Sequence, residues 1–94
     1  NIVFRCDSSS KIGIGHVMRS LALAGEYSKS NIIFATKNLL GNINHTILKY
    51  GYKVEILKSN KLSDFILITD KYKANMVVID CYDIDYLFEK QLKQ

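Results

Sequence analysis

Residues 2–24 of this chain, IVFRCDSSSKIGIGHVMRSLALA, decide its fold. Residues 2–6 form a short apolar run with β-branched members, which predicts a strand. A polar turn with two glycines follows, and the pattern after it predicts a helix over residues 15–28. Apolar side chains recur there at three- and four-residue steps, at Val17, Met18, Leu21, Ala22 and Ala24. The stretch therefore predicts a strand, a turn and a helix, which together begin an α/β fold.

The same alternation continues along the chain. Further strands are predicted at residues 31–35, 52–57 and 76–80. Further helices are predicted to begin at Asn42 or Asn44 with Ile43, Ile47 and Leu48 facing the core, at Ser59 or Asn60, and at Asp83. The helix through Lys71 has an alternative, because Phe65-Ile-Leu-Ile would also suit a buried strand. The order βαβαβαβα predicts a Rossmann-like parallel sheet with right-handed crossovers.

Composition limits the class of protein. The chain has 94 residues, enough for one domain, and its 48% hydrophobic content excludes a disordered segment. No apolar run approaches the ~20 residues that a membrane helix needs, so we expect no membrane partner. The net charge is +4, but the lysines are dispersed and match no nucleic-acid motif, so we expect no nucleic-acid partner. With two cysteines and no export signal, we expect a reduced, cytoplasmic protein.

The topology predicts where a ligand binds. An open parallel sheet binds ligands at the carboxyl ends of its strands, where the strand order reverses. In the usual order 3-2-1-4, that crevice lies between the first and fourth strands. Residues 6–19 and 80–83 should therefore meet there, and both segments are rich in polar residues.

The glycine turn is suited to a phosphate. Gly13 and Gly15 let a ligand approach the backbone, and the helix that follows offers unpaired N–H groups. Met18 stands where the dinucleotide fingerprint has its third glycine, and Thr36 and Lys37, not a carboxylate, follow the second strand. We therefore expect no nicotinamide cofactor, and the few cysteines and histidines predict no metal site.

His16 is the candidate catalytic base. The positive end of the helix dipole favours a neutral imidazole, which can accept a proton from water or a hydroxyl. The alternative is a structural histidine that only bonds nearby backbone. Arg19, one turn later, could reach a phosphate, Asp7 or Asp80, or remain solvated. His45 is expected at the surface.

Two further residue types follow the predicted strands. Tyr82, just beyond the fourth strand, could donate a hydroxyl hydrogen bond to a ligand or be an ordinary half-buried tyrosine. Cys6 and Cys81 end the first and fourth strands. We interpret them as reduced packing residues, not as a redox pair.

Residues 5–24 as a whole resemble a known family. They resemble the amino-terminal signature of the UDP-sugar hydrolases of pseudaminic acid biosynthesis, which release UDP from a UDP-linked 2,4-diacetamido-2,4,6-trideoxy-altrose. Residues 79–82 give a second, looser match, where the family tends to carry Asp-x-Tyr. The family has the two-domain glycosyltransferase-B architecture, so the resemblance implies a partial amino-terminal domain of that fold.

The resemblance implies roles for individual residues. His16 would activate water as general base, with inversion at the anomeric carbon and no metal or other cofactor, and Tyr82 would lie near the sugar and the attacking water. The substrate-binding residues would be Asp7, Ser8, Gly13, Ile14, Gly15, Arg19 and Asp80. Family members often carry histidine or asparagine at the position of Cys81.

The resemblance also implies a division of labour between domains. In the family, the uridine and diphosphate are held mostly by a carboxyl-terminal domain, which residues 1–94 do not include. We therefore expect UDP-sugar, water and that domain as partners, and little activity from this chain alone. Two alternatives remain open: a sugar transferase domain that deprotonates an acceptor hydroxyl, and a nucleotide-sugar-binding module without catalysis. Self-association through the strand at residues 76–80 is also expected.

Overall fold

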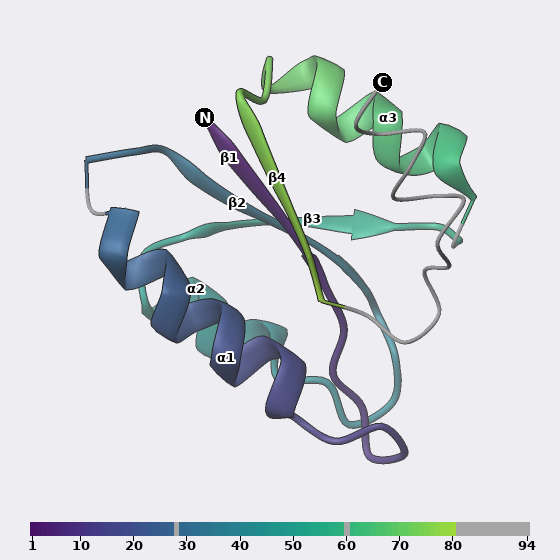
Figure 1. Cartoon of the computed structure of the whole chain (residues 1–94). Helices are drawn as coiled ribbons and strands as arrows, with labels where there is room; N and C mark the ends of the chain where they lie inside the picture. The colour runs from purple at the N-terminus through teal and green to yellow at the C-terminus, as the bar shows by residue number, and fades with distance from the viewer. Residues whose placement is uncertain (28, 60, 81–94) are drawn as a thin grey trace.

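The computed structural model describes residues 1–27, 29–59 and 61–80. Over these ranges the chain forms, in order, β1 (Ile2–Cys6), α1 (Gly15–Ala24), the 3-10 turn η1 (Gly25–Tyr27), β2 (Ile32–Lys37), α2 (Asn44–Lys49), β3 (Lys53–Leu57), α3 (Leu62–Lys71) and β4 (Met76–Asp80) (Figure 1). The predicted alternation of strands and helices is confirmed through β4. The helix expected from Asp83 lies outside the described residues, as do Cys81 and Tyr82.

The sheet is parallel throughout, in the order β3-β2-β1-β4. This confirms both the predicted α/β class and the predicted 3-2-1-4 order. β1 is central, with Phe4 paired to Phe34 of β2 on one side and to Val78 of β4 on the other. Helices α1 and α2 lie on one face of the sheet, and α3 lies on the other (Figure 1).

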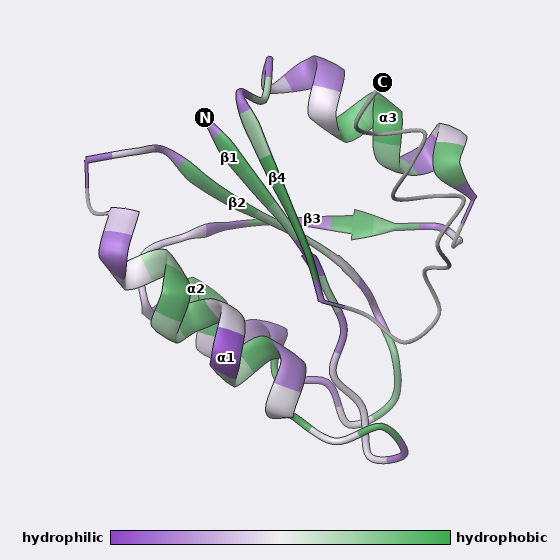
Figure 2. Ribbon diagram, viewed as in Figure 1, coloured by the Kyte–Doolittle hydropathy of each residue, from purple (hydrophilic) through white to green (hydrophobic). Residues whose placement is uncertain are grey.

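Alternate residues of each strand build the two halves of the core, since successive side chains of a strand point to opposite faces. Phe4 and Cys6 pack toward α1 and α2, whereas Val3 packs toward α3. The rings of Phe4 and Phe34 are stacked with centroids 5.1 Å apart. Figure 2 shows the central strands largely in the colour of hydrophobic residues, in keeping with the burial of β1 and β2 in the core.

Several boundaries and faces differ from the sequence-based expectation. Helix α1 ends at Ala24, not at residue 28, because Gly25 begins a 3-10 turn. Its buried face consists of His16, Val17, Ser20, Leu21 and Ala24. Met18 and Ala22 lie about 100° further round the helix than Val17 and Leu21, and both are exposed. In the short helix α2, Ile47 is buried but Leu48 is 57% exposed.

The ambiguous segment at residues 65–68 is helical. Phe65 and Ile68 are buried three positions apart, while Ile66 and Leu67 are exposed. Buried residues three positions apart fit the helical period of 3.6 residues, whereas a strand would bury every second residue. At the edge strand β3, Ile56 is 50% exposed, whereas Leu57 is buried.

Candidate functional site

The start of α1 and the end of β4 meet at the carboxyl edge of the sheet. The parallel register pairs Cys6 with Asp80, so the strand that leads into α1 ends beside the last residue of β4. His16 Nδ1 lies 2.5 Å from Asp80 Oδ1. The predicted meeting of the segments after the first and fourth strands is therefore confirmed as far as Asp80. Tyr82, expected in the same crevice, lies outside the described residues.

The contacts of His16 define its tautomer. Nδ1 lies 2.5 Å from Asp80 Oδ1 and 3.0 Å from an Nη atom of Arg19. A guanidinium only donates and a carboxylate only accepts, so one ring nitrogen cannot satisfy both. The shorter contact requires a proton between nitrogen and oxygen, and we assign Nδ1–H as the donor to Asp80. In the neutral ring, Nε2 then carries the lone pair.

Arg19 reaches Asp80, one of the three partners considered for it. Its Nε and one Nη donate to the two carboxylate oxygens at 3.2 and 3.0 Å. Burial raises the pKa of Asp80, but hydrogen bonds from Arg19 and His16 outweigh burial and leave the pKa below its ordinary value of 3.8. Asp80 is therefore a carboxylate at neutral pH, bound by a cation and an imidazole.

The turn before α1 is closed by its own hydrogen bonds. The N–H of Gly13 donates to the carbonyl of Ser9 at 2.9 Å, and the N–H of Ser9 donates back to Gly13 at 3.2 Å. Ser9 Oγ also accepts the N–H groups of Lys11 and Ile12. Gly13 has φ +82°, a left-handed conformation that favours glycine. The turn is thus a compact hairpin that delivers the chain to α1.

The first turn of α1 is open to a ligand. Ile14, at the N-cap, makes no side-chain capping bond, and the first turn contains no acidic residue. Ile14 is 48% exposed, and a Cβ placed on Gly15 would meet nothing within 4 Å. N–H groups at such a helix start attract phosphate. This geometry is compatible with the ligand contacts expected of Gly13, Ile14 and Gly15.

Asp7 and Ser8 lie inside the protein. Both are 0% exposed. Asp7 accepts two hydrogen bonds from the guanidinium of Arg5, at 2.8 and 3.1 Å, and one from the N–H of Lys37 at 2.7 Å. Ser8 Oγ accepts the N–H of Ile43 at 2.8 Å. The substrate contacts expected of these two residues stay a prediction, and their buried side chains suit a supporting role better.

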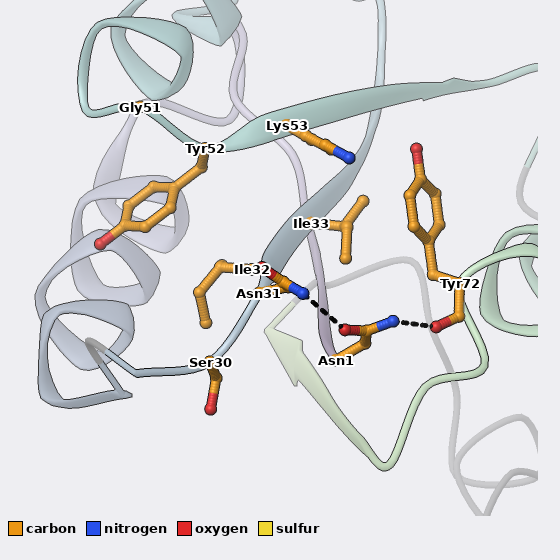
Figure 3. Close-up of a pocket in the computed structure, with 9 residues that line it drawn as sticks. All are labelled: Asn1, Ser30, Asn31, Ile32, Ile33, Gly51, Tyr52, Lys53 and Tyr72. Atoms are coloured by element: carbon orange, nitrogen blue, oxygen red, sulfur yellow. Dashed lines mark hydrogen bonds between the residues drawn. The ribbon is translucent and has the colours of Figure 1, made fainter.

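Hollows also lie elsewhere on the described surface, two of them at opposite ends of the strands. One, of about 530 Å³, lies beside the glycine turn and includes Lys11, Lys37 and Leu40 in its lining. The other, of about 280 Å³, lies at the amino ends of β2 and β3 (Figure 3). Asn31 donates to the side chain of Asn1 there, and Tyr72 and Lys53 form one wall. The second hollow is at the opposite end of the strands from His16.

The remaining candidate groups have simple environments. Cys6 is a free, buried cysteine, and burial raises its pKa to about 12, against smaller opposing effects. Its place in the core confirms Cys6 as a packing residue, and its reduced state stays a prediction. His45 is exposed, as expected.

Within residues 1–80, leaving aside 28 and 60, no group of three His, Cys, Asp or Glu side chains could hold a metal ion. No helix in that part of the chain is long and apolar enough to cross a membrane.

Comparison with known proteins gives two relatives. The chain is 37% identical over 92 residues to the UDP-2,4-diacetamido-2,4,6-trideoxy-beta-L-altropyranose hydrolase of Campylobacter jejuni, covering 98% of this chain and 32% of that protein. It is 34% identical over 91 residues to an uncharacterized protein of Methanocaldococcus jannaschii, covering 94% of this chain and 18% of that protein. No family model matches.

The chain thus spans a third or less of the length of these curated relatives. Within that span the similarity runs from one end of the chain almost to the other. The resemblance predicted from residues 5–24, to the hydrolases of this UDP-linked diacetamido-trideoxy-altropyranose, is confirmed over nearly the whole chain.

Proposed function

We propose that this chain is the amino-terminal part of a hydrolase that releases UDP from a UDP-linked 2,4-diacetamido-2,4,6-trideoxy-altropyranose. The observation that carries the proposal is the contact between His16 and Asp80 beside an open helix start. A histidine whose Nδ1–H is held by a carboxylate is the usual form of a general base. The similarity to the Campylobacter jejuni hydrolase supports the choice of substrate.

The chemistry follows from the tautomer. Nε2 of His16 accepts a proton from a water molecule as the water oxygen attacks the anomeric carbon. The bond between that carbon and the diphosphate oxygen breaks, and UDP leaves with the electron pair. Attack from the face opposite the leaving group inverts the anomeric centre. Asp80 stabilises the imidazolium that forms, because its carboxylate already accepts the Nδ1–H.

The substrate is held by groups of different kinds. The N–H groups at the start of α1, with Gly13 and Gly15 before them, balance charge on the diphosphate. Arg19 holds Asp80 in place and stays exposed enough to face the substrate as well. The resemblance assigns Tyr82 a role near the sugar and the attacking water, and that role stays a prediction. A carboxyl-terminal domain of glycosyltransferase-B architecture holds the uridine, in keeping with the greater length of the relatives.

The test uses the complete enzyme in water enriched in oxygen-18. We expect UDP release without an acceptor, with the label in the sugar hydroxyl and none in UDP. Label in UDP would place the attack on phosphorus and contradict the proposed chemistry. Release that requires an added acceptor sugar would instead identify a transferase, and binding without any release would identify a binding module.

A further inference from the structure

Resting on the proposed function, we propose that the loop between β2 and α2, residues 38–43, positions the catalytic turn, and that Gly41, Asp7 and Ser8 are its positioning residues. The loop contributes no side chain to the pair of His16 and Asp80. It lies behind the turn that leads into α1, at the same edge of the sheet (Figure 1).

The first link is the buried carboxylate of Asp7. Asp7 directly follows β1 and accepts the N–H of Lys37, the last residue of β2. The guanidinium of Arg5, 1% exposed, neutralises it with two hydrogen bonds. Charged groups buried this completely are held in one geometry, because any displacement would leave a charge without its partner. The ends of β1 and β2 are therefore joined beyond the last pair of their ladder, Arg5 with Ala35.

The second link joins the two loops directly. Ser8 Oγ accepts the N–H of Ile43 at 2.8 Å, just before α2 begins. The N–H of Ser10 donates to the carbonyl of Leu40 at 2.9 Å. The loop that provides these partners is itself braced, since the side chain of Asn42 donates to Leu39 and accepts the N–H of Asn44. A loop fixed by its own hydrogen bonds can hold the turn at residues 9–13 in place, whereas a loop without them would shift together with that turn.

The third link is a close approach of two backbones. A Cβ on Gly41 would lie 2.6 Å from the nitrogen of Ser10 and 3.1 Å from its Cα. Those atoms are backbone, so one of the two segments would have to move, and the hydrogen bonds that brace the loop favour movement of residues 9–13. Because Ser9 and Gly13 are hydrogen-bonded across that turn, the displacement passes to the start of α1 and to His16. Gly41 thus sets how closely the catalytic turn rests on the loop.

The experiment compares two glycines in the complete enzyme. Gly41 and Gly51 both have positive φ, at +79° and +89°, but a Cβ on Gly51 would meet nothing within 4 Å. Gly41→Ala and Gly51→Ala therefore share the backbone strain, and only the first carries the clash. We expect kcat to fall by about 10- to 100-fold in Gly41→Ala, the usual effect of a displaced catalytic group. In Gly51→Ala we expect a wild-type kcat and only the loss of thermal stability that the shared backbone strain causes.

A second readout does not depend on turnover. The Nδ1–H of His16 gives a low-field proton resonance, assigned by its loss in His16→Asn. It should shift or broaden in Gly41→Ala and stay in place in Gly51→Ala. A complete enzyme without hydrolase activity would contradict the proposed function, while this resonance would still decide the positioning. A folded Gly41→Ala variant with a wild-type kcat and an unmoved His16 resonance would overturn the positioning role of the loop.

A second pair of variants decides the case if Gly41→Ala does not fold. Ser8→Ala removes only the acceptor of the Ile43 N–H. Ser59→Ala is the control for losing a serine hydroxyl before a helix, because Ser59 Oγ accepts the N–H of Lys61 and donates to Asp64, away from His16. We expect the His16 resonance to move and kcat to fall about 10-fold in Ser8→Ala alone. Equal behaviour of the two serine variants would refute a positioning role for the loop.

Discussion

His16 Nδ1 and Asp80 Oδ1 lie 2.5 Å apart although 64 positions separate the two residues in the chain. The contact exists because β1 and β4 are parallel neighbours whose carboxyl ends coincide, with Cys6 opposite Asp80. Arg19 binds both oxygens of the same carboxylate. The proposed base, the carboxylate that contacts it and a cation that binds that carboxylate thus come from one helix and one strand end.

Replacing His16 with asparagine in the complete enzyme tests the base directly. We expect UDP-sugar binding to persist and turnover to fall by ~10²–10⁴-fold, the usual effect of a positioned base. Steady-state assays of UDP release, with binding measured separately by calorimetry, check this. Unchanged turnover would mean that His16 is structural.

Asp80→Asn tests the orienting carboxylate. The amide keeps the shape of the side chain but favours the wrong tautomer of His16, and we expect kcat to fall by up to ~10⁴-fold. Because the two residues act as a unit, the double variant with His16→Asn should be hardly slower than the slower single variant. Additive losses in this double-mutant cycle would show that Asp80 acts independently of His16.

The lowered pKa of Asp80 predicts a pH dependence of stability. A carboxyl whose folded-state pKa lies below its ordinary 3.8 stabilises the fold above that pH, and the contribution is lost as the pH falls through the folded-state value. We expect Asp80→Asn to cost about 1 kcal/mol of unfolding free energy near neutral pH, the usual net contribution of one hydrogen bond, because the amide keeps part of the contacts.

Urea unfolding of wild type and variant at neutral pH and well below pH 3.8 checks that prediction. The difference between them should shrink at the lower pH. Asp70→Asn, on the exposed surface of α3, is the control for removing a negative charge. A difference that grows on acidification would contradict the assigned hydrogen bonds.

Cys6 should resist thiol reagents while the protein is folded. Its pKa of about 12, raised mainly by burial from 9.0, leaves about 10³-fold less thiolate at mildly alkaline pH than an ordinary cysteine has. In a Cys81→Ser variant Cys6 is the single thiol of the chain, and mass spectrometry follows its labelling. We expect labelling only after urea is added. Rapid labelling of the folded chain would mean that the strand end opens readily.

The outer edge of β4 predicts self-association of the isolated chain. β4 is an end strand of the described sheet, with Val77, Val78 and Ile79 only partly buried. Unpaired backbone groups beside apolar side chains favour pairing with a second copy, most simply as a two-fold dimer. Sedimentation of the chain at micromolar concentration should show a dimer, and the complete enzyme should not dimerise through this edge. A clean monomer with protected β4 amides would show that the edge is already covered.

Local sequence patterns predicted the strands and helices of the fold, because each of these elements depends mainly on residues that are close in the chain. The alternation of apolar strands with helical periods was enough for a parallel sheet, and the usual strand order then placed residues 6–19 beside Asp80. Faces of single helices were harder, as the exposed Met18 and Leu48 show. A periodic pattern cannot tell which of two adjacent apolar residues meets the sheet, because that depends on how the helix is rotated against it.

The sequence by itself determined the α/β class, the glycine turn with His16 at a helix start, and the resemblance carried by residues 5–24. Only the tertiary structure decided that Asp80 contacts His16, that Arg19 binds Asp80 and not Asp7, and that Asp7 is buried against Arg5. It also decided the approach of Gly41 to Ser10. Each of these contacts depends on strand register or on the space between packed loops. Neither can be deduced from the residues that are neighbours in the chain, because both are set by contacts between distant segments.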